Sequence, residues 1–167
     1  MEKSIKSIAY NYGLYYALLS ITILVLIYAF NIEKNWVVSS TSLIISVIIF
    51  LFGIKALKNS NGGFLKLGEA IKVGLAIAAI GGIIAAVYTY IHYTYIHPEF
   101  IENIRELSME KAYELNPNLT TEQLEKGREM NEMFTSPFAL STFSLIGNLV
   151  FGIIVSLIVG LILKKES

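Results

Sequence analysis

The sequence predicts an all-α, polytopic membrane protein: a four-transmembrane-helix bundle with an extracytoplasmic acidic helical hairpin between helices three and four. Four stretches contain no Asp, Glu, Lys or Arg; they cover 7–32, 35–54, 73–98 and 133–163 and are 26, 20, 26 and 31 residues long. Each holds a dense apolar run, and about 20 apolar residues suffice to cross a hydrocarbon core of about 30 Å. Only 16% of all residues are charged, against about 25% in a typical soluble domain. A soluble bundle would need polar outer faces, which these stretches lack.

The spans follow from these stretches and from the residues beside them. We place them at about 8–30, 37–54, 73–93 and 138–163, within one domain that covers residues 1–167. Residues 31–35, with Lys34, form a tight link, and 59–63 has the composition of a turn. Aromatic side chains with a polar end favour the headgroup level of a bilayer. We therefore take these aromatics as markers of the interface: Tyr10, Tyr12, Tyr15, Tyr16 and Trp36.

The basic residues predict the orientation. The N-terminus, the 55–72 connection and the C-terminus lie on one side and carry two, four and two Lys or Arg, all near span ends. The other side has Lys34 and four bases in the segment 94–137, most of them far from the spans. Because short cytoplasmic loops are enriched in Lys and Arg, both termini are expected in the cytoplasm.

Residues 94–137 form the predicted hairpin. This segment holds nine acidic and four basic residues, which gives a local net charge of −5. Residues 116–118 should end a first helix, and Thr120 with Gln123 resembles a capping box that opens a second. An apolar stripe is expected to close on itself or on the membrane surface; its members are Phe100, Ile104, Leu107, Met130, Met133 and Phe134. The alternative is a disordered acidic linker.

Small residues recur at every fourth position of the third and fourth spans. Membrane helices lack a hydrophobic drive to associate, so small residues that permit close backbone approach mark their contact faces. We therefore predict that these two spans pack along a shared seam. Its residues are Gly74, Ala78, Gly82 and Ala86 on the third span and Gly152, Ser156 and Gly160 on the fourth.

Three polar residues form a candidate solute path: Asn148, Ser144 and Glu69. Polar groups deep in a span are often functional. An asparagine can equally hydrogen-bond a neighbouring helix, and Glu69 suits the start of a helix and the nearby lysine. We favour the packing interpretation for Asn148 and keep the path as the alternative.

His92 and His97 raise the question of a metal or pH-sensitive site, with Glu99 or Glu102 as a partner. Two histidines five apart do not share a face of an α-helix, so an aromatic cuff at the interface is favoured and no metal site is predicted. The chain has no cysteine, phosphate-binding loop, HExxH motif or nucleophile elbow. We expect no catalytic residue and no cofactor. The formal net charge of zero implies no nucleic-acid partner.

Several segments resemble a known family. They are Gly63-Phe64-Leu65-Lys66-Leu67-Gly68-Glu69-Ala70-Ile71-Lys72-Val73-Gly74, the aromatic run from Tyr90 to Glu99, and Ser136-Pro137 before a span closed by Lys164-Lys165. Over nearly the whole chain the sequence is similar to a bacterial integral-membrane family, domain of unknown function four-one-nine-nine. The resemblance implies four spans in a bacterial inner membrane and supplies no activity, cofactor or catalytic residue.

We expect a non-enzymatic scaffold, accessory subunit or envelope component. Ionisable groups are missing from the interiors of the spans, whereas ion-coupled transporters usually need them at depth. The expected surroundings are the lipid bilayer and a protein partner at the 94–137 hairpin, and homo-oligomerisation is left open. The alternative function is a small oligomeric transporter or channel.

Overall fold

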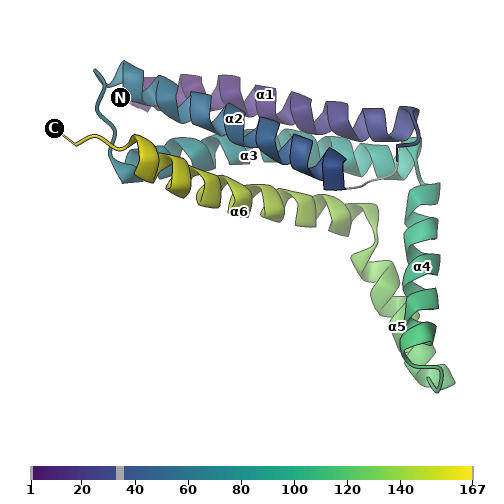
Figure 1. Ribbon diagram of the computed structural model, residues 1–167. Coiled ribbons are helices and arrows are strands. Elements are labelled where there is room, and N and C mark those ends of the chain that lie inside the picture. The colour runs from purple at the N-terminus through teal and green to yellow at the C-terminus, as the bar shows by residue number, and fades with distance from the viewer. Residues whose placement is uncertain (1, 33–35, 167) are drawn as a thin grey trace. The chain divides into compact units, whose positions relative to one another are not determined.

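The chain is almost entirely helical (Figure 1). The computed structural model describes residues 2–32 and 36–166, so the predicted link at 33–35, with Lys34, lies outside the described residues. Within those described, there are six α-helices and one π-helical turn. They are α1 (Glu2–Ala29), α2 (Trp36–Ser60), α3 (Leu67–Ile91), the π turn η1 (His92–Ile96), α4 (Glu99–Leu115), α5 (Thr121–Phe134) and α6 (Pro137–Leu163).

Four of these helices are long and apolar enough to cross a membrane: α1, α2, α3 with η1, and α6. The predicted all-α fold class with four spans is thus confirmed. Helices α1, α2 and α3 are longer than the predicted spans because they include lysines at their ends; α2, for example, runs beyond Lys55 to Ser60. A lysine there can keep its stem against apolar surface while its charge reaches water. Helix α6 begins one residue before its predicted span and ends at the predicted residue, Leu163.

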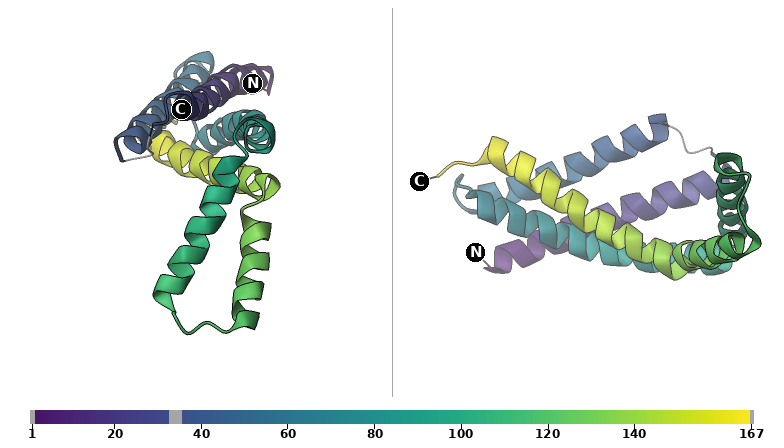
Figure 2. Two further views of the ribbon diagram at one scale, coloured as in Figure 1. Left: turned by 90° about the vertical axis from the view of Figure 1, so that its right-hand side faces the viewer. Right: turned by 90° about the horizontal axis from the view of Figure 1, so that it is seen from below.

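The chain divides into two compact units. The bundle unit comprises Met1–Ala86 and Ser144–Ser167, and the hairpin unit comprises Val87–Phe143. In the bundle unit the long helices run side by side, and both chain ends lie at the end that also carries the α2–α3 link (Figures 1 and 2).

Helix α3 is the most enclosed of the four, with half of its apolar window buried against 17–28% for the others. Its glycines permit this enclosure. A Cβ built on Gly81 would lie 2.6 Å from the backbone oxygen of Gly13, so α1 and α3 cross with almost no side chain between them. One built on Gly53 of α2 would lie 2.6 Å from Ile77 Cδ1, which brings α2 close to α3 as well.

A short ordered link joins α2 to α3 at the end of the bundle where the chain ends lie. Gly62 and Gly63 have φ angles of 68° and 89°, which residues with a Cβ rarely adopt. Leu65 then forms an isolated antiparallel bridge with Lys165, through two backbone hydrogen bonds of 2.9 and 3.0 Å. The turn predicted at 59–63 is found at 61–63, because α2 continues to Ser60. Leu65, which precedes α3, is fully buried in the bundle core.

The hairpin unit contains α4 and α5, so the prediction of two ordered helices is confirmed. Helix α4 ends at Leu115, directly before the predicted break. Thr120 caps α5: its hydroxyl accepts from the Gln123 amide at 3.3 Å, and the Gln123 side chain accepts from the Thr120 amide at 2.9 Å. The predicted capping box is therefore confirmed.

The predicted apolar stripe does not close on itself. Its last members on each helix are exposed, by 51% at Leu107, 58% at Met130, 60% at Met133 and 47% at Phe134. The two helices are instead joined by polar contacts around Arg105, described below.

Candidate functional site

The small-residue faces of α3 and α6 lie against each other. A Cβ built on Gly74 would overlap Ser156, and one built on Gly152 would overlap the Cβ of Ala78. Further along, a Cβ on Gly160 would lie 2.8 Å from Ala70 Cβ. The Ser156 hydroxyl donates to the Gly152 backbone oxygen of its own helix, so its polar end is satisfied within the seam. The contact is therefore close helix packing with no free polar group at Ser156.

The same seam ends at a polar contact around Asn148. Gly82 lies beside it, since a Cβ built there would be 3.2 Å from Asn148 Cβ, and the last predicted member, Ala86, is 9% exposed. The Asn148 side-chain oxygen accepts a 2.7 Å hydrogen bond from the Tyr16 hydroxyl. This bond links α1 to α6 through two residues that are 132 positions apart in the sequence.

Tyr16 lies in the core of the bundle. It is 4% exposed, and its ring stacks on Phe151 with centroids 6.3 Å apart and meets Phe50 edge-on at 5.3 Å. The prediction that Tyr16 faces the headgroups is therefore wrong. The prediction placed Tyr16 near the start of a span, but α1 begins at Glu2 and Tyr16 lies in its middle. Its hydroxyl there bonds to a protein partner, and its ring packs against neighbouring helices. Tyr10 and Trp36 are exposed, by 61% and 78%.

The three residues of the candidate polar path are not brought together as a group. Glu69 lies in the first turn of α3, where its Oε2 accepts a 2.9 Å hydrogen bond from the Lys66 amide. Asn148 packs beside Gly82, which is 13 residues further along α3, or about 20 Å at 1.5 Å per residue. Ser144 is half-buried one turn before Asn148 on α6. Glu69 thus acts as a helix cap far from the other two.

His92 and His97 lie closer together than predicted. The π turn η1 joins them through a 2.8 Å hydrogen bond from the His97 amide to the His92 backbone oxygen. Their rings are 5.9 Å apart, whereas residues five apart on an α-helix face different directions. The assumption that they share no face is therefore wrong. His97 Nε2 is 3.9 Å from Glu99 Oε1. Over the described residues, no group of three or more His, Cys, Asp or Glu could hold a metal ion.

Aromatic rings surround this histidine pair. Tyr93 stacks on Phe100 with centroids 4.7 Å apart, and Tyr88 lies 5.8 Å from His92. His97 in turn lies 5.5 Å from Phe100. The cluster joins the π turn to the start of α4 by ring packing.

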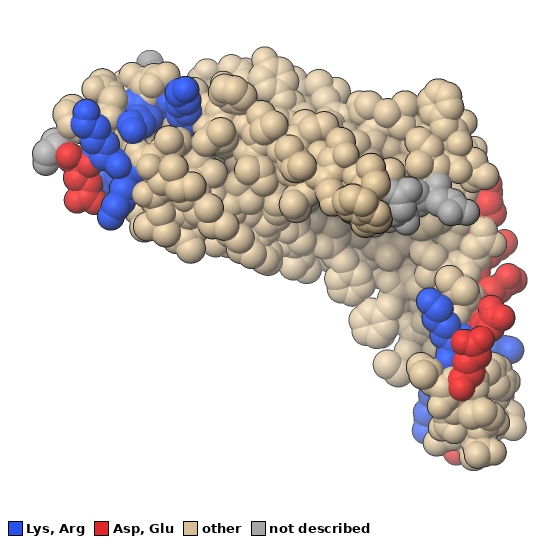
Figure 3. Space-filling view, viewed as in Figure 1, with Lys and Arg blue, Asp and Glu red and all other residues tan. Residues whose placement is uncertain are grey.

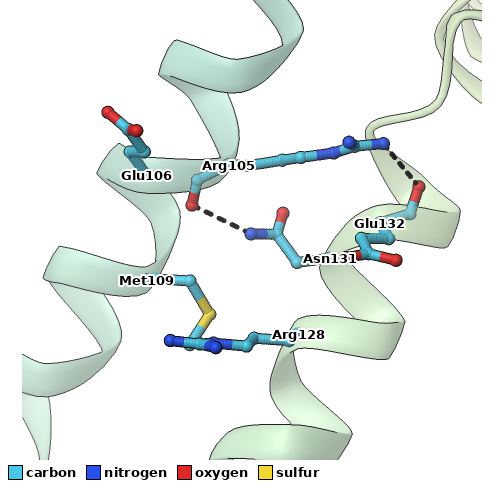
Figure 4. A pocket seen from close by; sticks show the side chains of 6 residues that line it. All are labelled: Arg105, Glu106, Met109, Arg128, Asn131 and Glu132. Carbon is cyan, nitrogen blue, oxygen red and sulfur yellow. Dashed lines mark hydrogen bonds between the residues drawn. The ribbon is translucent and has the colours of Figure 1, made fainter.

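In the hairpin unit, Arg105 connects α4 to α5 through hydrogen bonds (Figure 4). Its Nε donates to the Thr135 hydroxyl at 3.0 Å, and its backbone oxygen accepts from Asn131 Nδ2 at 3.0 Å. Two open grooves flank this contact. One of about 310 Å³ is lined by Arg105, Glu106, Met109, Arg128, Asn131 and Glu132, and one of about 400 Å³ has a more apolar lining that includes Met109, Ala112, Leu119, Leu124 and Met130.

The acidic residues of the hairpin point outward (Figure 3). All nine glutamates of 94–137 are exposed. Glu122 pairs with Lys126 at 2.7 Å, and Glu99 lies near His97. Within the part of the chain that the structure describes, the other seven form no ion pair; they are Glu102, Glu106, Glu110, Glu114, Glu125, Glu129 and Glu132.

Comparison with known proteins agrees with this architecture. Neither the curated proteins nor the solved structures compared with the chain gave a match. A family profile described as "Protein of unknown function (DUF4199)" matches residues 11–165, which covers most of the first apolar helix and all of the other three with the hairpin. The chain, with its four long apolar helices and its six-helix architecture, therefore belongs to the DUF4199 family, the family that its sequence resembles.

Proposed function

We propose that this protein is a non-enzymatic membrane scaffold, accessory subunit or envelope component that presents the hairpin unit to a basic protein partner. The observation that carries the proposal is the set of seven exposed glutamates that have no ion pair among the described residues. Exposed carboxylates without cations of their own are available to a partner that supplies Lys or Arg. Electrostatic complementarity of this kind speeds association and selects partners.

The spacing of these glutamates supports the proposal. Glu102, Glu106, Glu110 and Glu114 follow one another at four-residue steps on α4, so they lie along one face. Like charges at this spacing destabilise a helix by roughly 0.2–0.5 kcal/mol per pair. Three such pairs therefore cost about 1 kcal/mol in the isolated protein. A cationic partner would remove this cost on binding.

The hairpin does not need these carboxylates for its fold. The contact between α4 and α5 uses Arg105, Asn131 and Thr135, and the cap of α5 uses Thr120 and Gln123. Neutralising the glutamate row should therefore leave the two helices in place. This separation makes the proposal testable by substitution.

The test is photo-crosslinking in native membranes from a reactive residue at the exposed position of Asn103. We expect a defined adduct with a partner. Glu106→Gln with Glu110→Gln should abolish it. The matched control is Glu99→Gln with Glu122→Gln, which also removes two glutamates, but ones that already have a basic side chain nearby, His97 and Lys126. The control should keep the adduct.

Two further readouts complete the test. High salt should weaken the adduct, because exposed charges are screened within about 10 Å at 0.1 M ionic strength. An adduct that survives both the Glu106/Glu110 variant and high salt would refute the proposal, as would the absence of any adduct at this position.

The alternative of a small oligomeric transporter or channel depends on Asn148. Its side-chain oxygen is engaged by Tyr16 inside the bundle, which supports a packing role. Solute flux in proteoliposomes that is lost in Asn148→Leu, with unchanged folding, would favour the transporter over the scaffold.

A further inference from the structure

We infer that the lysine end of the bundle unit is a binding surface for the phosphate headgroups of anionic phospholipids. The lysine end is the end that carries both termini and the α2–α3 link, where lysine side chains gather (Figure 3). Its members are all exposed: Lys55, Lys66, Lys72, Lys164 and Lys165. They come from the end of α2, from the start of α3 with the link before it, and from the residues after α6.

No carboxylate of the described residues neutralises these lysines. None of the five forms an ion pair there. Glu69 turns its Oε2 to the Lys66 amide and caps α3. Glu166, which directly follows Lys165, is exposed and forms no ion pair with a described lysine. The predicted pairing of Glu69 with a lysine side chain is therefore absent. An exposed cationic cluster whose ammonium groups form no ion pair among the described residues suits an external anion.

Lys58 differs from these five lysines and is not counted as part of the surface. It is half-buried, and its ammonium donates a 2.8 Å hydrogen bond to the Leu163 backbone oxygen at the end of α6. That position satisfies a terminal carbonyl and favours the helix dipole. Lys58 thus serves the fold, and the five exposed lysines do not.

The surface is ordered by backbone contacts. The bridge between Leu65 and Lys165 ties the residues after α6 to the α2–α3 link. It leaves Phe64 43% exposed, with the Lys165 ammonium 5.6 Å above the ring centroid. A phenyl group and an ammonium held together match the boundary between acyl chains and headgroups, where one side is apolar and the other anionic.

Phe64 also decides between two sources of phosphate. A soluble phosphate would gain nothing from an exposed phenyl ring, whereas a bilayer can bury it. The lysines lie at the ends of membrane-crossing helices, so their ammonium groups reach the headgroup level. Each lysine near an anionic lipid surface contributes about 1 kcal/mol, or roughly fivefold in affinity. The bilayer is therefore the expected ligand source.

The test measures lipid adducts on the purified full-length protein by native mass spectrometry, with phosphatidylglycerol and phosphatidylcholine of identical acyl chains. We expect clear preference for phosphatidylglycerol. Lys66→Gln with Lys165→Gln should weaken its binding by about tenfold or more, and leave phosphatidylcholine unaffected. Lys111→Gln with Lys126→Gln, which removes two lysines from the hairpin unit, is the matched control and should change nothing.

Other outcomes would overturn the inference. They are an unchanged lipid preference in the Lys66/Lys165 variant, or an equal loss in the hairpin control. Displacement of the lipid by sodium phosphate, but not by sodium chloride of equal ionic strength, would assign the surface to soluble phosphate instead. If the Lys66/Lys165 variant does not fold, Lys55→Gln with Lys72→Gln tests the same surface away from the backbone bridge, with the same expected loss.

Discussion

Replacing Gly152 by alanine should destabilise the bundle unit, because the absent side chain is the contact point between α3 and α6. A Cβ built there would overlap Ala78 Cβ and lie 3.3 Å from Phe50 Cε1 and 3.4 Å from the Gly74 backbone oxygen. Nonbonded carbon atoms in good contact are about 3.5–4.0 Å apart. Ala78 Cβ and the Gly74 oxygen are fixed to the backbone of α3, so neither can turn aside. The helices must separate.

The size of the effect follows from two opposing terms. Overpacking a filled site costs about 1–3 kcal/mol. Alanine gains up to about 1 kcal/mol over glycine through helix propensity. A net loss of roughly 1–2 kcal/mol in the free energy of unfolding is therefore expected for Gly152→Ala. Gly152→Leu should lower the free energy of unfolding further, because its larger side chain would also separate Gly160 from Ala70 in the neighbouring contact.

Gly147 provides a matched control on the same helix. It is exposed, and a Cβ built there would meet no atom within 4 Å. Gly147→Ala should therefore be neutral or slightly stabilising. Both variants can be compared in detergent by thermal unfolding and by titration with a denaturing detergent. Equal melting temperatures for Gly152→Ala, Gly147→Ala and the unchanged protein would refute the reasoning.

Two further predictions concern topology and the polar contact. Reporter fusions after Ser60 and Ser167 should read cytoplasmic and one near Asn116 external, because short loops rich in Lys and Arg are expected on the cytoplasmic side; any reversal contradicts the predicted orientation. In a double-mutant cycle, Tyr16→Phe and Asn148→Leu should show a coupling of about 0.6–1.7 kcal/mol in unfolding, as expected for a hydrogen bond between membrane helices. Additive effects would mean that the bond contributes nothing to stability.

The sequence was sufficient to predict the helices, because a charge in the middle of a span is costly. That cost removes Asp, Glu, Lys and Arg from the spans, so the charge-free stretches mark four helices. Local signals were equally direct in the hairpin, where Thr120 and Gln123 form the cap that their spacing indicates. The small-residue faces of α3 and α6 also lie in contact, since four-residue steps place such residues along one side of a helix.

Contacts between distant segments could not be predicted in the same way. The bond from Tyr16 to Asn148 depends on how α1 is rotated against α3, and the close approach of Gly13 to Gly81 fixes that rotation. The residue pattern of one helix does not indicate which residues of the other helix it will contact. The exposed Leu107 illustrates the same limit. The helical spacing of the predicted stripe was correct, but the contacts of Arg105 determine which side of α4 faces α5.

The histidine pair shows how a change of helix type misleads an argument from spacing. The prediction assumed an α-helix, in which residues five apart diverge. The π turn widens the ring to an i→i+5 hydrogen bond, so His92 and His97 become neighbours. No signal in the single sequence distinguishes this turn from the continuing α-helix, although the aromatic run from Tyr88 to Phe100 packs around it.

The residues that stabilise the fold differ from the charged residues that are exposed. Packing in the bundle unit uses glycines and the Tyr16–Asn148 bond, and the hairpin is joined through Arg105. The glutamate row and the five lysines of the lysine end take part in none of these contacts through their charges. Neutralising the five lysines should therefore leave the free energy of unfolding within about 0.5 kcal/mol of its original value, as for most surface substitutions. Neutralising the glutamate row should raise that free energy by about 1 kcal/mol, because it removes the three like-charge pairs on α4. If such a variant remains folded, a loss of partner or lipid binding can be assigned to the charged surface itself. If the variant unfolds, the loss of binding cannot be assigned to that surface.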